Sequence, residues 1–342
     1  MQRRVWGMFL IFCFINLSGF TVIGHRGEPA KAPEHSFQSY DQVLADHADY
    51  IEQDLEISQD GVLVVSHDPM TDRTMNRKYI IDKNSWQTLK QAEFTNHEHL
   101  HRLSDVFERY RSNPKAKFMI ETRLLNNQMV MEDKLVALVK ANHLEKRVYF
   151  ESFSMVSLEK LHHLLPEVPL LFLNYNEPYN YRQLQSPRYN FLSAVSMRVS
   201  YASDQVVKTL HQAHKQVIPY DNFSENISRV ADNRKKFDGF FTNYTGVYTH
   251  QNKCVEHPQA ITTQAKDTTK VFDSPFKRAE YRSIEGKRLN LKPNTTWQVN
   301  YALKGLDNQV YYDLGSSQWI KAPQPKKTTL LSRIWKKVKG IF

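Results

Sequence analysis

The stretch between positions 24 and 68 concentrates side chains that can bind a cation and move a proton. Glu52 and Asp54 stand two residues apart in Tyr50–Ile57, whose apolar positions are typical of a β-strand. Side chains alternate between the two faces of a strand, so both carboxylates point the same way. Because paired carboxylates on a buried face repel each other and lose hydration, a divalent cation with oxygen ligands would offset both costs. An exposed, charged strand face is the alternative interpretation.

Two histidines end the β-prone runs that flank this carboxylate pair. His25 follows the run 20–23, and His67 follows the run 62–65. Histidine titrates near neutral pH, so one ring can act as a base and the other as an acid. Arg26 adds a planar guanidinium whose geometry suits the oxygens of a phosphate. A single histidine at a strand end is more often structural, but two beside a carboxylate pair favour acid–base catalysis.

The order and spacing of these motifs resemble the glycerophosphodiester phosphodiesterase family. The resemblance spans about residues 20 to 250 and is carried by His25-Arg26-Gly27, Pro33-Glu34-His35-Ser36, Glu52-x-Asp54, Asp60-Gly61, His67-Asp68, Asp72-Arg73-Thr74, Glu121-Thr122-Arg123 and Phe241-Thr242-Asn243-Tyr244. It implies a (β/α)8 barrel that uses one divalent cation and two histidines to hydrolyse glycerol phosphodiesters.

The resemblance also assigns a cation site to this chain. Glu52, Asp54 and Glu121 would be its ligands. All three supply hard oxygen donors, which favour Ca²⁺ or Mg²⁺ over Zn²⁺. The expected cofactor is therefore one divalent cation, Ca²⁺ or Mg²⁺.

The remaining motif residues would handle the substrate. By the resemblance, His25 and His67 divide the acid and base roles, while Arg26 and Arg123 contact the phosphate. In the family's usual account, the neighbouring glycerol hydroxyl attacks phosphorus and water then opens the cyclic phosphate. The products would be glycerol 3-phosphate and an alcohol. The expected substrates are small glycerophosphodiesters or teichoic-acid-like polyglycerol-phosphate polymers.

Two positions depart from the family's pattern. Arg123 stands where many members carry Lys, and Ile218-Pro219-Tyr220 stands where many carry a Trp-Thr pair. The second departure leaves the preference for a leaving group open. Two other functions were weighed: a catalytically inactive barrel that serves as a cell-surface binding protein, and a sphingomyelinase-D-like enzyme, whose usual disulfides this chain lacks.

Strand and helix patterns alternate along residues 20–250. The expected strands are 20–23, 51–55, 118–122, 148–152, 170–173, 194–198, 217–220 and 239–243, and the expected helices are 36–48, 85–94, 104–111, 129–141, 155–165, 204–214 and 224–233. This alternation predicts a parallel sheet with helical crossovers. Barrels of this kind place catalytic groups at the C-terminal ends of their strands. The predicted fold is α/β, a (β/α)8 TIM barrel with a small C-terminal all-β domain.

The N-terminal segment and the overall charge point to the cell surface. Arg3 and Arg4 precede an apolar run, so residues 1–19 are interpreted as a signal peptide or N-terminal membrane anchor, with a buried core segment as the alternative. This predicts an extracytoplasmic protein, either secreted or anchored at the surface. The net charge of +10 suits anionic partners. No nucleic-acid-binding motif occurs, so nucleic acid is not an expected partner.

The region beyond the barrel changes in composition. Residues 251–270 are expected to form a linker, 271–322 a small β module, and 323–342 a basic amphipathic tail. The β module resembles S-layer-associated and SH3-like wall-binding modules. We therefore expect this region to hold the protein on the cell wall or an anionic membrane surface. A C-terminal extension packed on the barrel and a disordered solubilising tail are the alternatives.

Overall fold

The computed structural model describes residues 19–221, 230–249, 255–263, 269–272, 290–304, 309–314 and 318–322. The predicted N-terminal segment up to residue 18 and the predicted basic tail 323–342 lie outside the described residues, so both stay predictions. Within the described part of the chain, no helix is long and apolar enough to cross a membrane.

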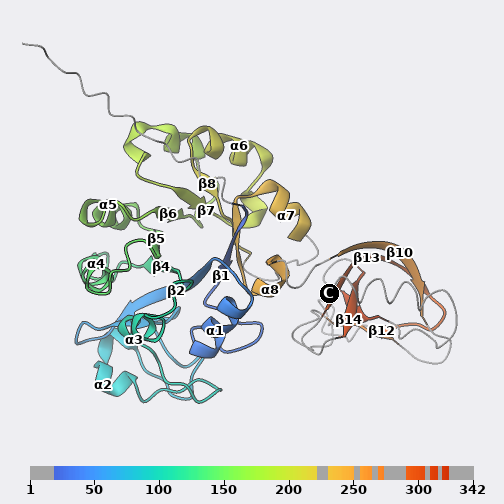
Figure 1. Cartoon of the computed structure of the whole chain (residues 1–342), viewed down its shortest axis with the longest axis horizontal. Coiled ribbons are helices and arrows are strands. Elements are labelled where there is room, and N and C mark those ends of the chain that lie inside the picture. The colour runs from blue at the N-terminus through green and yellow to red at the C-terminus, as the bar shows by residue number, and fades with distance from the viewer. Residues whose placement is uncertain are drawn as a thin grey trace, which may run out of the picture.

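A parallel barrel forms the larger part of the molecule (Figure 1). Its neighbouring strands follow the order β8-β7-β6-β5-β4-β2-β1-β9. Single parallel bridges from Tyr220 to Arg198 and to Phe241 continue the sheet from the β8 side to β9, which brings the two edges together. The strands are β1 (Thr21–Gly24), β2 (Tyr50–Ile57), β4 (Phe118–Thr122), β5 (Val148–Ser152), β6 (Leu170–Leu173), β7 (Ala194–Ser196), β8 (Gln216–Val217) and β9 (Gly239–Thr242). The predicted (β/α)8 fold is confirmed.

Helices cover the outside of this barrel. They are α1 (Phe37–Ala45), α2 (Trp86–Leu89), α3 (Leu103–Arg109), α4 (Glu132–Ala141), α5 (Met155–Leu164), α6 (Asp204–Gln212), α7 (Val230–Lys236) and α8 (Thr245–Tyr248), with 3-10 turns at Ile81–Lys83, Tyr181–Gln185, Pro187–Tyr189 and Val199–Tyr201. The hydroxyls of Ser36, Ser154 and Ser203 cap α1, α5 and α6 by accepting backbone N–H bonds. Helix α1 ends before the predicted position 48, and His47 there has a left-handed φ of 57°.

A hairpin arm extends β2 beyond the barrel. β3 (Leu63–Val65) pairs antiparallel with β2, from Ile57 opposite Leu63 to Leu55 opposite Val65. The turn between them contains Gly61 at a φ of 80°, a conformation that glycine adopts readily. The arm carries the chain back beside Asp54, because Ser66 N donates to Asp54 O at 3.0 Å. The residue after Ser66 is His67, so the hairpin brings this histidine to the site.

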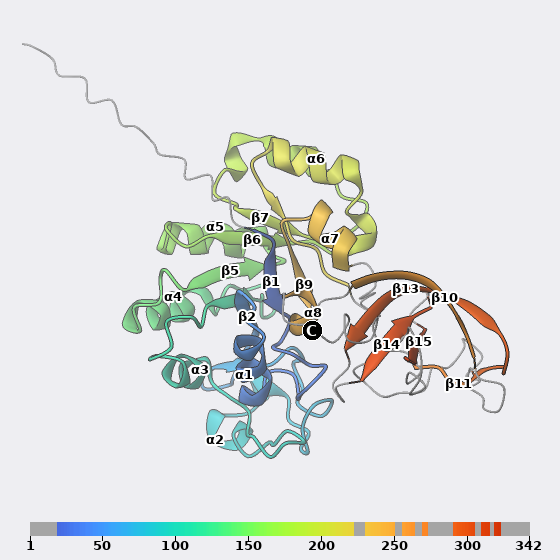
Figure 2. The ribbon, with the colours of Figure 1, turned by 45° about the vertical axis from the view of Figure 1, so that its right-hand side comes forward.

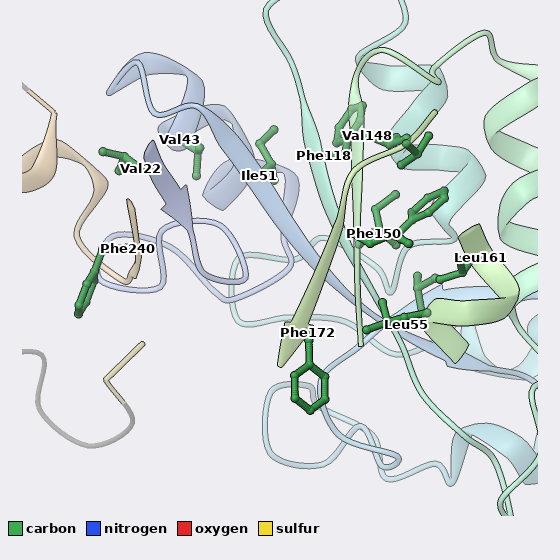
Figure 3. Packing of buried hydrophobic residues seen from close by; sticks show 14 of the residues in the cluster. Val22, Val43, Ile51, Leu55, Phe118, Val148, Phe150, Leu161, Phe172 and Phe240 are labelled. Carbon is green, nitrogen blue, oxygen red and sulfur yellow. The ribbon is translucent and has the colours of Figure 1, made fainter. Parts of the chain in front are cut away.

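Alternate residues of each barrel strand face two different cores. Val22, Phe118 and Phe150 belong to the outer core between strands and helices, where Phe150 of β5 faces Leu161 of α5 (Figure 3). A second core fills the inside of the barrel and contains Ile23, Met119, Tyr149, Leu171, Leu173, Ala194, Ile218 and Phe241. Apolar side chains therefore fill the interior of the barrel. The polar groups lie at the C-terminal ends of the strands, above this apolar core.

A small all-β region follows the barrel, as predicted. One sheet has the antiparallel order β10 (Val255–Thr262), β13 (Thr296–Lys304), β14 (Val310–Asp313) and β15 (Trp319–Lys321), and β11 (Thr269–Lys270) pairs with β12 (Asn290–Leu291). β10 lies in the range 251–270, for which the sequence predicted a linker. A polar segment forms a strand here because its backbone pairs with β13, which requires no apolar side chains.

The all-β region packs against the barrel. Tyr311 and Trp319 are each 1% exposed and belong to the same hydrophobic cluster as Phe240 and Tyr248. Figures 1 and 2 both show β13 and β14 on the side of the molecule that carries α8. This arrangement matches the alternative of an extension packed on the barrel, and the wall-binding role of the region stays a prediction.

Candidate active site

A cavity of about 520 Å³ opens among the segments that follow the barrel strands. Among the predicted site residues, all except Arg123 line it. They are His25, Arg26, Glu52, Asp54, His67 and Glu121. These residues come from β1, β2, β4 and the hairpin arm, so the fold unites groups that are far apart in the sequence.

The turn after β1 presents His25 and Arg26. Arg26 and Gly27 have φ values of 58° and 90°. A Cβ on Gly27 would lie 2.1 Å from Ser39 Oγ, so this position requires glycine for close approach as well as for its backbone angle. The turn also leaves Arg26 N directed at Glu52 Oε2, at 2.5 Å.

His25 is held as a neutral imidazole. Its Nδ1 lies 3.1 Å from Asn243 Oδ1. A carbonyl oxygen only accepts, so Nδ1 carries the hydrogen and Nε2 keeps its lone pair. Burial, assisted by the charge of Arg26, lowers the pKa of His25 to about 3. The ring is therefore neutral at physiological pH, and its Nε2 lone pair is available to accept a proton from a substrate hydroxyl.

His67 has a different environment. Its side chain is 36% exposed, and its Nδ1 lies 2.6 Å from Asp68 Oδ1. Burial lowers the pKa of His67, while the charges of Asp54 and Asp68 oppose that shift. Arg73 bonds both Asp68 and Glu34, which ties the hairpin arm to the loop after β1. A carboxylate on Nδ1 stabilises the protonated ring, so His67 is the better placed of the two histidines to carry a proton.

Four buried carboxylates face the cavity. Strand register pairs Asp54 with Glu121 and Glu121 with Glu151, so these three lie in a row across β2, β4 and β5. Glu52 lies on the same face of β2 as Asp54. Burial and the neighbouring charge of Asp54 raise the pKa of Glu52, and burial raises the pKa of Glu121 to about 7. Burial also raises the pKa of Glu151 well above its usual range.

Arg123 is surrounded by protein acceptors, and its predicted contact with phosphate stays a prediction. Its guanidinium donates to Glu121 Oε1 at 2.5 Å, to Asp54 Oδ1 at 2.6 Å and to Glu56 Oε1 at 3.3 Å, as well as to the His67 carbonyl. Several protein oxygens surround the guanidinium, because its planar set of N–H donors can reach more than one acceptor at once. Burial would raise the pKa of Asp54, but the charge of Arg123 and the other bonds to this carboxylate outweigh it and lower the pKa.

The donor set fits a hard divalent cation, although the side chains are not arranged as a cation cage. Among the described residues, no group of three or more His, Cys, Asp or Glu side chains is placed to hold a metal ion. Arg123 bridges two of the predicted ligands. Yet Glu151 Oε2 is buried without a hydrogen-bond partner among the residues that the structure describes. Carboxylate oxygens around a cavity are the ligands that Ca²⁺ and Mg²⁺ prefer.

Comparison with known proteins agrees with this geometry. The model of the glycerophosphoryl diester phosphodiesterase family matches residues 25–247. The chain belongs to this family. The enzyme class predicted from the motifs is thereby confirmed, and members of the family are generally dependent on a divalent metal.

Relatives named glycerophosphodiester phosphodiesterase include proteins from two Bacillus species. The one from Bacillus subtilis (strain 168) is 31% identical over 172 residues, which cover 44% of this chain and 58% of that protein. The one from Bacillus altitudinis is 26% identical over 239 residues, which cover 65% of this chain and 94% of that protein. Both matches are shorter than this chain.

Solved structures share the barrel. A glycerophosphodiester phosphodiesterase from Agrobacterium tumefaciens has a TM-score of 0.58 at 20% identity, over 67% of this chain and 99% of that one. A phosphodiesterase from Oleispira antarctica, solved with its product sn-glycerol-3-phosphate, has a TM-score of 0.56 at 20% identity, over 67% and 94% of the two chains. At this identity the likeness shows the common fold.

Three residues of this family member were not assigned a role from the sequence. Glu151, near the end of β5, and Asn243, directly after β9, line the cavity. His35, which is 2% exposed, has Nε2 3.0 Å from Asp54 Oδ2 and Nδ1 3.0 Å from the Tyr40 hydroxyl, so it positions a predicted cation ligand. The sequence feature that could have identified Glu151 is an acidic residue near the C-terminal end of a barrel strand.

The wall of the cavity beyond the carboxylates is aromatic. Phe153 and Tyr175 lie with ring centroids 5.0 Å apart at 63°, and Leu173, Tyr220 and Phe241 continue the lining. Tyr220 belongs to the segment that departs from the family's Trp-Thr pair. The phosphodiesterase therefore offers polar groups on one side and an apolar surface on the other.

Proposed function

We propose that this chain hydrolyses glycerophosphodiesters to glycerol 3-phosphate and an alcohol, with one divalent cation, Ca²⁺ or Mg²⁺, held by Glu52, Asp54 and Glu121. The observation that carries the proposal is the convergence of two histidines, Arg26 and buried carboxylates on one cavity. Membership of the family and the product bound to the Oleispira antarctica phosphodiesterase support the substrate class. A cation bound here would supply polarisation of a phosphoryl oxygen.

The two histidines divide the proton transfers. His25 Nε2 accepts the proton of the neighbouring glycerol hydroxyl as its oxygen bonds to phosphorus. The bond from phosphorus to the leaving alcohol breaks, and protonated His67 donates its proton to the leaving oxygen. The pairing of His67 with Asp68 supports this order, because the carboxylate stabilises the charged ring.

The second step restores both rings. Water attacks the cyclic phosphate while His67 accepts a proton from it. The ring P–O bond breaks, and His25 returns its proton to the released glycerol oxygen. Arg26 stabilises the negative charge on the phosphoryl oxygens. Arg123 acts indirectly, by positioning Asp54, Glu121 and the His67 backbone.

Release of glycerol 3-phosphate from glycerophosphocholine and glycerophosphoethanolamine tests this function. Turnover should require Ca²⁺ or Mg²⁺ and should cease with EDTA. Binding of these diesters without turnover under every metal condition would instead support an inactive barrel. Release of choline phosphate in place of glycerol 3-phosphate would contradict the proposed bond cleavage.

The location and the polymer substrate extend the proposal. We propose that the chain works outside the cytoplasm and also cleaves polyglycerol-phosphate polymers, held near them by the C-terminal region. The net charge of +10 supports an anionic partner. Incubation with lipoteichoic acid and chromatography of the products would test it, and an unchanged polymer would rule this substrate out.

A further inference from the structure

Glu151 is the one carboxylate of the row across β2, β4 and β5 that the described residues leave without a cation. It follows Phe150 near the end of β5, its side chain is 1% exposed, and it lines the cavity. Its Oε2 atom is buried and has no hydrogen-bond partner in the described part of the chain.

The other three buried acids of the cavity have defined partners. Asp54 accepts from Arg123 and His35, Glu121 accepts from Arg123, and Glu52 accepts from Arg26 N. Leaving a buried charge uncompensated is strongly unfavourable. The charged form of Glu151 would be stabilised by a further positive charge in the cavity beside it.

Strand register places Glu151 where such a charge is expected. Its Cα is the register partner of Glu121, and Glu121 is the partner of Asp54. Neighbouring strands lie ~4.8 Å apart, so three carboxylates on the same face converge on a shared space. Phe153 and Tyr175 of the cavity lining carry no positive charge, whereas Arg198 lines the cavity as well as Arg26.

We propose that Glu151 is a fourth carboxylate ligand of the divalent cation and makes the site selective for Ca²⁺ over Mg²⁺. The inference rests on the cation of the proposed function. Ca²⁺ takes six to eight oxygen ligands and tolerates several carboxylates, whereas Mg²⁺ keeps several waters and is usually bound by one or two carboxylates. A fourth acid therefore favours the larger ion.

Isothermal titration calorimetry on the full chain, stripped with EDTA, tests the assignment with Ca²⁺ and Mg²⁺ as probes. Glu151→Gln should weaken Ca²⁺ binding by about tenfold or more and Mg²⁺ binding by less, because charge count tunes affinity at such sites. Glu151→Asp keeps the charge and should bind Ca²⁺ more tightly than the Gln variant. Glu132→Gln is the control, since Glu132 is fully buried on α4 and outside the cavity.

Thermal unfolding of the same proteins separates a ligand from a merely structural acid. Glu151→Gln should raise the Tm of the metal-free protein, because it removes a buried acid that the described residues leave without a hydrogen-bond partner on Oε2. It should also reduce the rise in Tm on adding Ca²⁺. A structural acid would instead lower the metal-free Tm when replaced.

Two results overturn the inference in different ways. Ca²⁺ binding by Glu151→Gln within about threefold of wild type removes Glu151 from the cation site and leaves the proposed function standing. Absence of binding of either ion to the wild-type chain overturns the cation part of the proposed function, and this inference with it.

Discussion

Arg123 is expected to hold the carboxylate row together, and Arg123→Ala tests this. Its side chain is 23% exposed, and its guanidinium donates to Asp54, Glu121 and Glu56. Replacement by Ala leaves these carboxylates close together and without their shared counter-charge. The prediction is a large loss of stability in the metal-free protein.

The magnitude follows from the burial of the acids. Asp54, Glu121 and Glu56 are 2%, 5% and 8% exposed. Removing one partner of a buried ion pair typically costs ~3–5 kcal/mol, and we expect a loss of free energy of unfolding in this range at pH 8. Arg123→Lys should lose less free energy of unfolding than Arg123→Ala. It keeps the positive charge and lacks only the planar guanidinium that reaches several oxygens.

Urea unfolding in EDTA measures the loss of stability of each variant. Urea unfolding in Ca²⁺ measures how much of that stability a bound cation restores. Ca²⁺ should stabilise Arg123→Ala more than it stabilises wild type, since a bound cation replaces the missing charge. A loss below about 1 kcal/mol in EDTA, typical of an exposed ion pair, would refute the reasoning. So would equal stabilisation of the two proteins by Ca²⁺.

Three further predictions follow from other parts of the molecule. His25→Ala and His67→Ala should each lower kcat on glycerophosphocholine by ~10²–10⁴, and a loss under tenfold in steady-state kinetics would reduce that histidine to a structural role. Burial raises the pKa of Glu28 to about 9, above its unfolded value, so its contribution to stability is full at low pH and declines as pH rises toward 9. Glu28→Gln should therefore flatten the fall of Tm between pH 5 and 9, and an unchanged slope would contradict this. Removal of residues 323–342 should weaken binding to isolated cell envelopes, and binding that is unchanged, or insensitive to salt, would show that the tail is not the anchor.

The barrel was predictable because its pattern is repeated and local. Strands 118–122 and 148–152 were predicted with the bounds that β4 and β5 have. The Asp60-Gly61 pair marks the turn of the hairpin that returns His67, because Asp-Gly favours positive φ and Gly61 has a φ of 80°. Motif residues at strand ends converged on one cavity because parallel strands all end on one face.

Side-chain partners within the cavity were less predictable. The resemblance implied a contact of Arg123 with phosphate, which stays a prediction, and the structure shows contacts of its guanidinium with Asp54 and Glu121. That choice depends on which acceptors are nearest in space, which motif order does not show. Glu151 was not assigned for a similar reason, since its importance comes from register with Glu121 across two strands. β10 was missed because polar strands lack an apolar period.

The central claim is that the buried carboxylates form the cation site of a phosphodiesterase. The most direct measurement is release of glycerol 3-phosphate from glycerophosphocholine by Glu52→Ala, Asp54→Ala and Glu121→Ala, with circular dichroism as the check on folding and Glu132→Gln as the control. The account predicts folded variants without Ca²⁺- or Mg²⁺-dependent turnover and an active control. Wild-type turnover in any one of the three would remove that residue from the site, and wild-type turnover in all three would contradict the claim.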